Sequence, residues 1–340
     1  MRRILVVNVN WLGDAILTTP VFRALEEKYP SSYVAVMCVE RVKEVFENNP
    51  YVDEIIIFDE KSIQNNLGEK LKFAKFLKAK NFDTAFLIHR SFTRAFICML
   101  AGIKIRVGYK RLKNFFVLTN KIIAPAIDIH RQDYYFYLFE KTGIFIKDKM
   151  PKVFINPRFK DKFRDIISET QDKYSYIVGI NASANWLLKR WPTQNFAALC
   201  DRLVKELNCA IIFICAAKDR VTSEEIIRQM NEPSYNLCGQ TNLKELAALM
   251  EVMNLFTSND SGPAHLAAAV GIPTIALFGP TSSKITSPRG KYVTIIKKDI
   301  SCKIPCYKLD CKNNICMTGI TVDEVFLEAK RILSNTPTKA

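Results

Sequence analysis

Short apolar runs alternate with longer amphipathic segments along most of this 340-residue chain. A nearly continuous apolar run indicates a strand that is covered on both faces, and strands alternating with helices indicate a parallel, doubly wound sheet. The pattern therefore predicts an α/β fold. The strands are expected over residues 4–9, 33–38, 54–58, 83–88 and 105–108, and then over residues 176–181, 210–215, 253–257 and 274–278.

The alternation is interrupted once, near the middle of the chain, and then restarts. Residues 147–157 are polar and contain Pro151 and Pro157, which is typical of a boundary between domains. We therefore predict two similar domains, residues 1–160 and 161–340, facing each other across a cleft. Ligands are expected in that cleft, at the carboxyl ends of the strands. A last helix is expected over residues 322–333. In one of the arrangements considered, this helix packs back on the first domain.

The net charge of the chain indicates what kinds of partner it binds. Formal net charge is +15, which points to an anionic partner such as nucleic acid, an anionic membrane surface or a phosphorylated substrate. No apolar run reaches the roughly 18 residues that span a bilayer. Asn8 and Asn10 interrupt the first apolar run, and Asp14 follows it where a signal peptide has small residues. We therefore expect a first strand and a cytoplasmic protein.

A polar turn at residues 258–265, Ser-Asn-Asp-Ser-Gly-Pro-Ala-His, joins an apolar strand to a helix of small residues. The backbone N–H groups and the dipole of a helix N-terminus favour phosphate. The alternative is an ordinary turn in which Asp260 or Ser261 caps the helix.

Two further segments of the second half follow predicted strands. Residues 181–192 contain small polar residues, including Ser183, that could form a backbone cradle, and Lys189 and Arg190 can reach phosphate oxygens. The alternative is a solvated basic pair beside a buried tryptophan. Asp219 either accepts hydrogen bonds from ribose hydroxyls or caps a helix.

The first predicted strand ends at Trp11-Leu12-Gly13-Asp14. This loop lacks the G-x-G-x-x-G pattern, so dinucleotide binding by the first half is not predicted. Asp14 has two interpretations, a helix N-cap or a carboxylate that acts as general base.

Four cysteines near the C-terminus follow the spacing C-x3-C-x4-C-x4-C. This spacing suits a zinc site, a pair of disulfides or a redox-sensitive loop. A reducing cytoplasm argues against obligatory disulfides. The cysteines are Cys302, Cys306, Cys311 and Cys316.

Four motifs together resemble glycosyltransferase family 9, which contains the ADP-heptose:lipopolysaccharide heptosyltransferases. They are Trp-Leu-Gly-Asp (11–14), Lys-Arg-Trp-Pro (189–192), the 258–269 segment and Ala-Leu-Phe-Gly-Pro-Thr (276–281). The chain is most similar to the heptosyltransferase II type, whose relatives often carry Gly-His where this chain has Asn313 and Asn314. The resemblance implies a GT-B fold of two Rossmann-like domains, with the donor held mainly by the second. It also implies inverting transfer of L-glycero-D-manno-heptose from ADP-heptose to the inner core of lipopolysaccharide.

The resemblance assigns roles to particular residues. Asp14 resembles the catalytic base, Lys189 the lysine on the donor phosphates and Asp219 an acid near the ribose. The family's donor-binding turn corresponds to Asp260, Ser261, Gly262 and His265 in this chain. Ser183 is also expected to bind the donor. The residues expected to contact the acceptor are Trp11, Gly13, Arg90, Arg94, Lys110 and Arg111.

The expected partners are ADP-heptose, the lipid A-core acceptor and the anionic inner leaflet, at the inner face of the inner membrane. The basic stretch of residues 104–121 is either a solvated face or a contact with acceptor phosphates or that leaflet. No cofactor is expected to be required. One alternative is a GT-B transferase for another nucleotide sugar. The other is a nucleic-acid-binding protein, which the absence of a nucleic-acid motif disfavours, so no nucleic-acid partner is expected.

Overall fold

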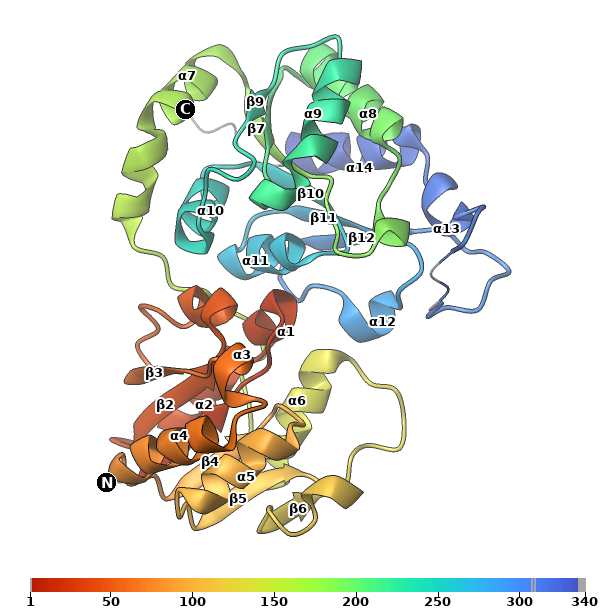
Figure 1. The fold of residues 1–340 in the computed structure, drawn as a ribbon. Helices are drawn as coiled ribbons and strands as arrows, with labels where there is room; N and C mark the ends of the chain where they lie inside the picture. Colours follow the sequence, from red (N-terminus) through yellow and green to blue (C-terminus); the bar gives the residue numbers. More distant parts are fainter. Residues whose placement is uncertain (1, 307, 309, 336–340) are drawn as a thin grey trace. The chain divides into compact units, whose positions relative to one another are not determined.

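The computed structural model describes residues 2–306, 308 and 310–335 (Figure 1). The chain forms two compact units, Met1–Phe154 and Ile155–Ala340, called here the first and the second unit. Each unit contains a six-stranded sheet, and every strand pairing among the described residues is parallel. The predicted α/β class with two doubly wound parallel sheets is therefore confirmed. The division falls within the polar stretch of residues 147–157.

The sheet of the first unit has the strand order β3-β2-β1-β4-β5-β6. The order reverses between β1 and β4, and the crevice at such a reversal is the usual ligand site of a doubly wound sheet. Helices flank the strands, and the buried face of the sheet is built from the apolar runs of β1 and β2. The strands are β1 (Arg3–Val7), β2 (Tyr33–Cys38), β3 (Glu54–Ile57), β4 (Thr84–Leu87), β5 (Ile105–Tyr109) and β6 (Asn120–Ile122). The main helices are α1 (Leu12–Leu17), α2 (Pro20–Lys28), α4 (Leu67–Ala79), α5 (Phe92–Leu100) and α6 (Arg131–Glu140), with a short α3 (Glu60–Ile63).

The sheet of the second unit repeats this plan, with the order β12-β11-β10-β7-β8-β9 and the reversal between β7 and β10. Its strands are β7 (Tyr176–Asn181), β8 (Cys209–Phe213), β9 (Tyr235–Asn236), β10 (Leu255–Asn259), β11 (Thr274–Phe278) and β12 (Val293–Lys297). Its helices include α7 (Arg164–Lys173), α8 (Thr193–Leu207), α9 (Arg220–Gln229), α10 (Leu243–Met250), α11 (Gly262–Val270) and α14 (Val322–Ser334). Short helices η4 (Leu187–Lys189), η5 (Ala217–Asp219), α12 (Ser283–Thr286) and α13 (Ile315–Thr318) lie in the connections.

Helix ends in the second unit follow from local sequence. Asn208 and Gly271 adopt left-handed backbone angles directly after α8 and α11, as is common at helix C-termini. Thr321 and Glu324 form a reciprocal capping box at the start of α14. The apolar face of α14 packs into the core of the second unit, through Val325, Phe326 and Ala329. Its return to the first domain stays a prediction.

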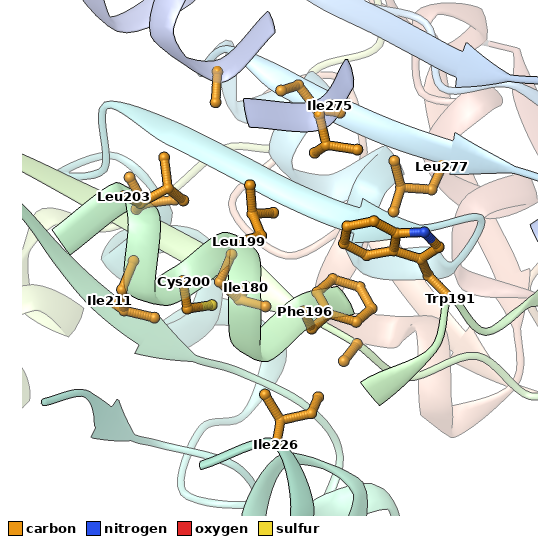
Figure 2. Close-up of a cluster of buried hydrophobic side chains, with 14 of the residues drawn as sticks. Ile180, Trp191, Phe196, Leu199, Cys200, Leu203, Ile211, Ile226, Ile275 and Leu277 are labelled. Carbon is orange, nitrogen blue, oxygen red and sulfur yellow. The ribbon is translucent and has the colours of Figure 1, made fainter. Parts of the chain in front are cut away.

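Trp191 belongs to a cluster of buried side chains in the second unit, where it lies beside Phe196 and Leu277 (Figure 2). Its ring packs edge-on against Phe196 of α8 at 4.9 Å between centroids, and its Nε1 donates to the Ile320 carbonyl at 2.9 Å. Burying a tryptophan of this size with its N–H satisfied is strongly stabilising. The buried Trp191 therefore anchors to the core the backbone segment on which Lys189 and Arg190 lie.

Three strands and several strand ends differ from the sequence prediction, and β1 and β8 each end two residues earlier than expected. The strands β6, β9 and β12 were not predicted, and all three lie at sheet edges, where their residues are mostly half-buried and their apolar pattern is weak. Strand β10 continues through Ser258 and Asn259, because both side chains are fully buried and hydrogen-bonded. Within the described residues, the model contains no helix that is both long and apolar enough to cross a bilayer.

Candidate active-site residues of the two units

The carboxyl ends of β7 and β10 meet the start of α11 in a network of amide and hydroxyl groups. Asn181 Nδ2 donates to Ser258 Oγ at 2.9 Å and to Ser261 Oγ at 2.8 Å, and Ser183 Oγ donates to Asn181 Oδ1 at 2.8 Å. Ser261 occupies the N-cap position of α11, but its side chain makes no capping hydrogen bond. The first turn of α11, beginning at Gly262, is therefore not capped by that side chain, which leaves its positive end suited to an anion.

Asp260 holds a cation at this helix terminus. Its Oδ2 is 2.7 Å from Lys189 Nζ and accepts a 2.6 Å hydrogen bond from Thr281 Oγ1. Asp260 is 6% exposed, whereas the Lys189 side chain is 23% exposed, so the lysine is only partly buried at this turn. The structure brings together the predicted Lys189, Asp260 and Ser261, and it adds Thr281, the last residue of the 276–281 motif.

Arg190 and Asp219 form a second ion pair at the ends of β7 and β8, with Nη2 and Oδ1 2.9 Å apart. Arg190 also donates from Nε and Nη2 to the Ala184 carbonyl at 2.9 and 2.8 Å, and from Nη1 to Thr222 Oγ1 at 3.1 Å. These contacts occupy the guanidinium within the protein, so Arg190 clamps the loop after β7 rather than presenting a fork to a phosphate. Asp219 precedes α9 without a side-chain capping bond.

Asn259 is a buried residue that the sequence analysis did not single out. Its Oδ1 accepts a hydrogen bond from the Trp191 backbone N–H at 3.1 Å, and its Nδ2 donates to the Ala182 carbonyl at 2.7 Å. It ties both ends of the 182–191 loop to β10. Its position directly after the apolar strand residues, at the start of the polar turn of residues 258–265, was the available signal. His265 is also buried, in α11.

In the first unit, Asp14 lies in the first turn of α1, whose N-cap is Trp11. Asp14 is therefore not the cap residue that one interpretation made it. Its Oδ1 accepts a 2.7 Å hydrogen bond from the hydroxyl of Tyr135, a buried residue of α6. Burial, followed by the charge of Asp14, raises the pKa of Tyr135 well above its usual range, so the phenol stays a hydrogen-bond donor. No sequence signal linked these two residues.

Arg94 of α5 is 1% exposed and supports the segment that precedes Trp11. Its Nη1 donates to the Asn8 carbonyl at 2.9 Å and its Nη2 to Asn10 Oδ1 at 2.8 Å, with Glu60 3.6 Å away. Burial is the main cause that lowers the pKa of Arg94 to about 10. With its donors used inside the unit, Arg94 supports the Asp14 loop in this structure, and the burial does not favour the predicted acceptor contact.

The other predicted acceptor residues lie nearer the surface. Arg90 donates to the hydroxyl of Tyr134, whose ring stacks on Tyr109 at 4.3 Å between centroids. Burial, followed by the charges of Arg111 and Arg131, lowers the pKa of Arg90, which places these arginines in one positive cluster. Trp11 is 62% exposed, and Lys110, Arg111 and Gly13 are exposed or half-buried. Acceptor binding by these residues stays a prediction.

The four C-terminal cysteines differ in exposure: Cys302 is exposed, Cys306 and Cys311 are half-buried, and Cys316 is buried. Burial is the main cause that raises the pKa of Cys316, and the other three thiols raise it further. In the part of the chain that the structure describes, no three cysteine, histidine or carboxylate side chains form a metal-binding group. Zinc binding by these thiols stays a prediction.

The arrangement has known counterparts among solved structures. The fold superposes on the crystal structure of a glycosyl transferase family 9 protein from Veillonella parvula DSM 2008 with a TM-score of 0.88, at 24% identity over 98% of both chains. It superposes on Escherichia coli ADP-heptose lps heptosyltransferase II with a TM-score of 0.83, at 25% identity over 98% of this chain and 99% of that one. The two parallel sheets, with polar residues at their carboxyl ends, define a glycosyltransferase of the GT-B class.

The sequence comparison narrows this class to one family. Residues 70–316 match the model of glycosyltransferase family 9 (heptosyltransferase). The lipooligosaccharide heptosyltransferase 2 of Haemophilus ducreyi (strain 35000HP / ATCC 700724) is 29% identical over 98% of this chain and 99% of its own length. The chain belongs to glycosyltransferase family 9, and the resemblance noted from its motifs is confirmed.

Proposed function

We propose that this enzyme transfers L-glycero-D-manno-heptose from ADP-heptose to the inner core of lipopolysaccharide, with inversion at the anomeric carbon. The observation that carries the proposal is the pairing of Lys189 with Asp260 at the N-terminus of α11. A cation beside a helix N-terminus is suited to the diphosphate of a nucleotide sugar. The relatives named lipooligosaccharide heptosyltransferase 2 and ADP-heptose lps heptosyltransferase II support the choice of heptose and of ADP.

In the donor part of the reaction, the bond between the anomeric carbon and the diphosphate oxygen breaks. Negative charge then grows on the leaving ADP. Lys189 and the backbone N–H groups of Ser261 and Gly262 would stabilise this charge more strongly in the transition state than in the bound donor. Asp219 would accept hydrogen bonds from the ribose, and its pairing with Arg190 holds the carboxylate in place.

In the acceptor part of the reaction, a sugar hydroxyl attacks the anomeric carbon from the face opposite the leaving ADP. Its proton passes to the Asp14 carboxylate, so the products are the glycoside, ADP and protonated Asp14. General-base assistance of this kind typically contributes 10²- to 10⁴-fold. The Tyr135 hydroxyl on Oδ1 orients the carboxylate.

The acceptor is lipid-anchored in this proposal, so we also propose that the enzyme acts at the cytoplasmic surface of the inner membrane. The positive cluster of Arg90, Arg111 and Arg131 supports binding of phosphates or acidic sugars of the acceptor.

The test is mass spectrometry of products from purified enzyme, ADP-heptose and a series of truncated core acceptors. The expected result is one acceptor whose mass increases by one heptose unit, with ADP released in equal amount. A parallel reaction with UDP-sugars controls for the donor. Transfer from a UDP-sugar and none from ADP-heptose would refute the proposed donor, and the acceptor series identifies the sugar that receives the heptose.

A further inference from the structure

The connection from β5 to β6, residues 110–119, exposes several large apolar side chains to solvent. Leu112 is 94% exposed, Phe116 is 89% exposed and Phe115 is 42% exposed. Large apolar side chains rarely gather at such exposure unless they meet a partner. The loop is called here the β5–β6 loop.

The backbone of this loop is anchored, so the apolar side chains project from a built structure. Val117 and Leu118 are buried in the core of the first unit, and the buried Asn114 accepts a hydrogen bond at its carbonyl from the Leu118 N–H at 3.2 Å. Arg106 Nε donates to the Val117 carbonyl at 2.6 Å. One set of residues thus holds the loop to the sheet, and the other set, Leu112, Phe115 and Phe116, is left outside.

Cations surround the exposed apolar residues. Lys110, Arg111 and Lys113 are exposed within the same loop, and Lys121 Nζ lies 3.9 Å from the centroid of the Phe115 ring. The sequence contains no acidic residue from position 102 to position 127. This combination complements a surface that is anionic at its face and apolar below it.

We propose that the β5–β6 loop docks on an anionic phospholipid bilayer, with Leu112 and Phe116 entering the boundary between headgroups and acyl chains. Lys110, Arg111 and Lys113 contact the phosphates, since apolar burial and attraction to anionic lipid add together in interfacial binding. Phe115 and Phe116 are aromatic and could stack on nucleic-acid bases, but the most exposed apolar side chain of the loop, Leu112, is aliphatic and complements acyl chains rather than bases. The inference rests on the proposed function, because the lipid-anchored acceptor proposed there brings the enzyme to a membrane.

The experiment is co-sedimentation of the full chain with phosphatidylcholine vesicles that contain or lack phosphatidylglycerol. The wild-type protein is expected to bind the anionic vesicles, with binding that weakens as salt is added. The affinity of the double variant Leu112→Ser/Phe116→Ser for these vesicles is expected to be at least about tenfold lower, because two apolar side chains no longer enter the bilayer. A matched control, Leu67→Ser/Phe145→Ser, removes two other exposed apolar side chains of the same unit and is expected to bind as wild type.

Three outcomes would overturn the docking: no preference of the wild-type protein for anionic vesicles, wild-type binding by Leu112→Ser/Phe116→Ser, or an equal loss in the control variant. Retention on DNA without retention on vesicles would also overturn it. The double variant is expected to keep its activity on a soluble, delipidated core acceptor, which shows that the variant is folded. Failure of the wild-type enzyme on that soluble acceptor would count against the proposed function and leave the vesicle result to stand by itself.

Discussion

In both units an arginine supports the loop that follows the first strand, but the two arginines lie in different surroundings. Arg94 donates to the Asn8 carbonyl after β1, and Arg190 donates to the Ala184 carbonyl after β7. Arg94 is 1% exposed and its nearest carboxylate, Glu60, is 3.6 Å away, whereas Arg190 is 21% exposed and pairs with Asp219 at 2.9 Å.

This difference matches the chemistry expected at each edge. The first unit buries the guanidinium of Arg94 below the Asp14 loop. The half-buried Asp14 carboxylate accepts its hydrogen bond from a neutral phenol, that of Tyr135. The second unit has its cations at or near the surface, where Lys189 can meet an anion. A shared plan of strands thus serves proton removal at one edge and diphosphate binding at the other.

The largest effect is expected from Asp14→Asn, which keeps the shape of the side chain and removes the base. Turnover should fall by about 10²- to 10⁴-fold, while the affinity for ADP, measured by calorimetry, should not change. Asp128→Asn, on an exposed residue of the same unit, is the control. Normal turnover by Asp14→Asn would remove Asp14 as the base.

The next effect is on stability and separates the two arginines. Arg94→Met leaves the Asn8 carbonyl and Asn10 without their buried donor and should lower the free energy of unfolding by about 3 kcal/mol. Arg190→Met breaks a more exposed pair and should cost about 1 kcal/mol. Urea denaturation of both variants measures the difference. Equal losses would mean that burial of the guanidinium does not set its contribution.

Lys189→Ala tests the anion side of the comparison. Loss of a charge-assisted contact, together with an Asp260 carboxylate left without its cation, should raise the dissociation constant for ADP-heptose by about 10- to 100-fold. Lys205→Ala, on an exposed lysine of α8, controls for net charge. Identical calorimetric affinities for Lys189→Ala and wild type would contradict the phosphate role.

The smallest effect is expected from Tyr135→Phe. Without the hydroxyl, the Asp14 carboxylate is less well oriented, and kcat should fall by about 3- to 10-fold with no change in the KM for the donor. Tyr137→Phe on the same helix is the control, since its hydroxyl is not the group that reaches Asp14. A rise in KM with kcat preserved would place Tyr135 in donor binding instead.

The central strands could be predicted because their apolar runs are nearly continuous, and parallel pairing brings their carboxyl ends to one edge. This explains why the sequence alone could place Lys189, Asp219, Asp260 and Ser261 after neighbouring strands, while their role in donor binding stays a prediction. The edge strands β6, β9 and β12 were missed because residues that are half-buried give only a weak pattern.

The contacts of Tyr135 and Arg94 could not be predicted because their partners are distant in sequence. Tyr135 meets Asp14 across 121 positions, and Arg94 meets Asn8 across 86. Sequence spacing carries no information about such pairs, and a charged residue on a helix reads as solvent-exposed. The burial of Arg94 became visible only with its contacts to Asn8 and Asn10, which follow β1.

The position of Trp191 links recognition to heat resistance in the second unit. Its indole packs among the largest buried side chains and bonds to Ile320, while the next two residues toward the N-terminus are Arg190 and Lys189. A nucleotide that binds Lys189 in the proposed donor site would bind only while this packing persists, so it should raise the melting temperature of the second unit by mass action. Inhibitors of the donor site would therefore also act as thermal protectants, and a melting shift offers a simple screen for them.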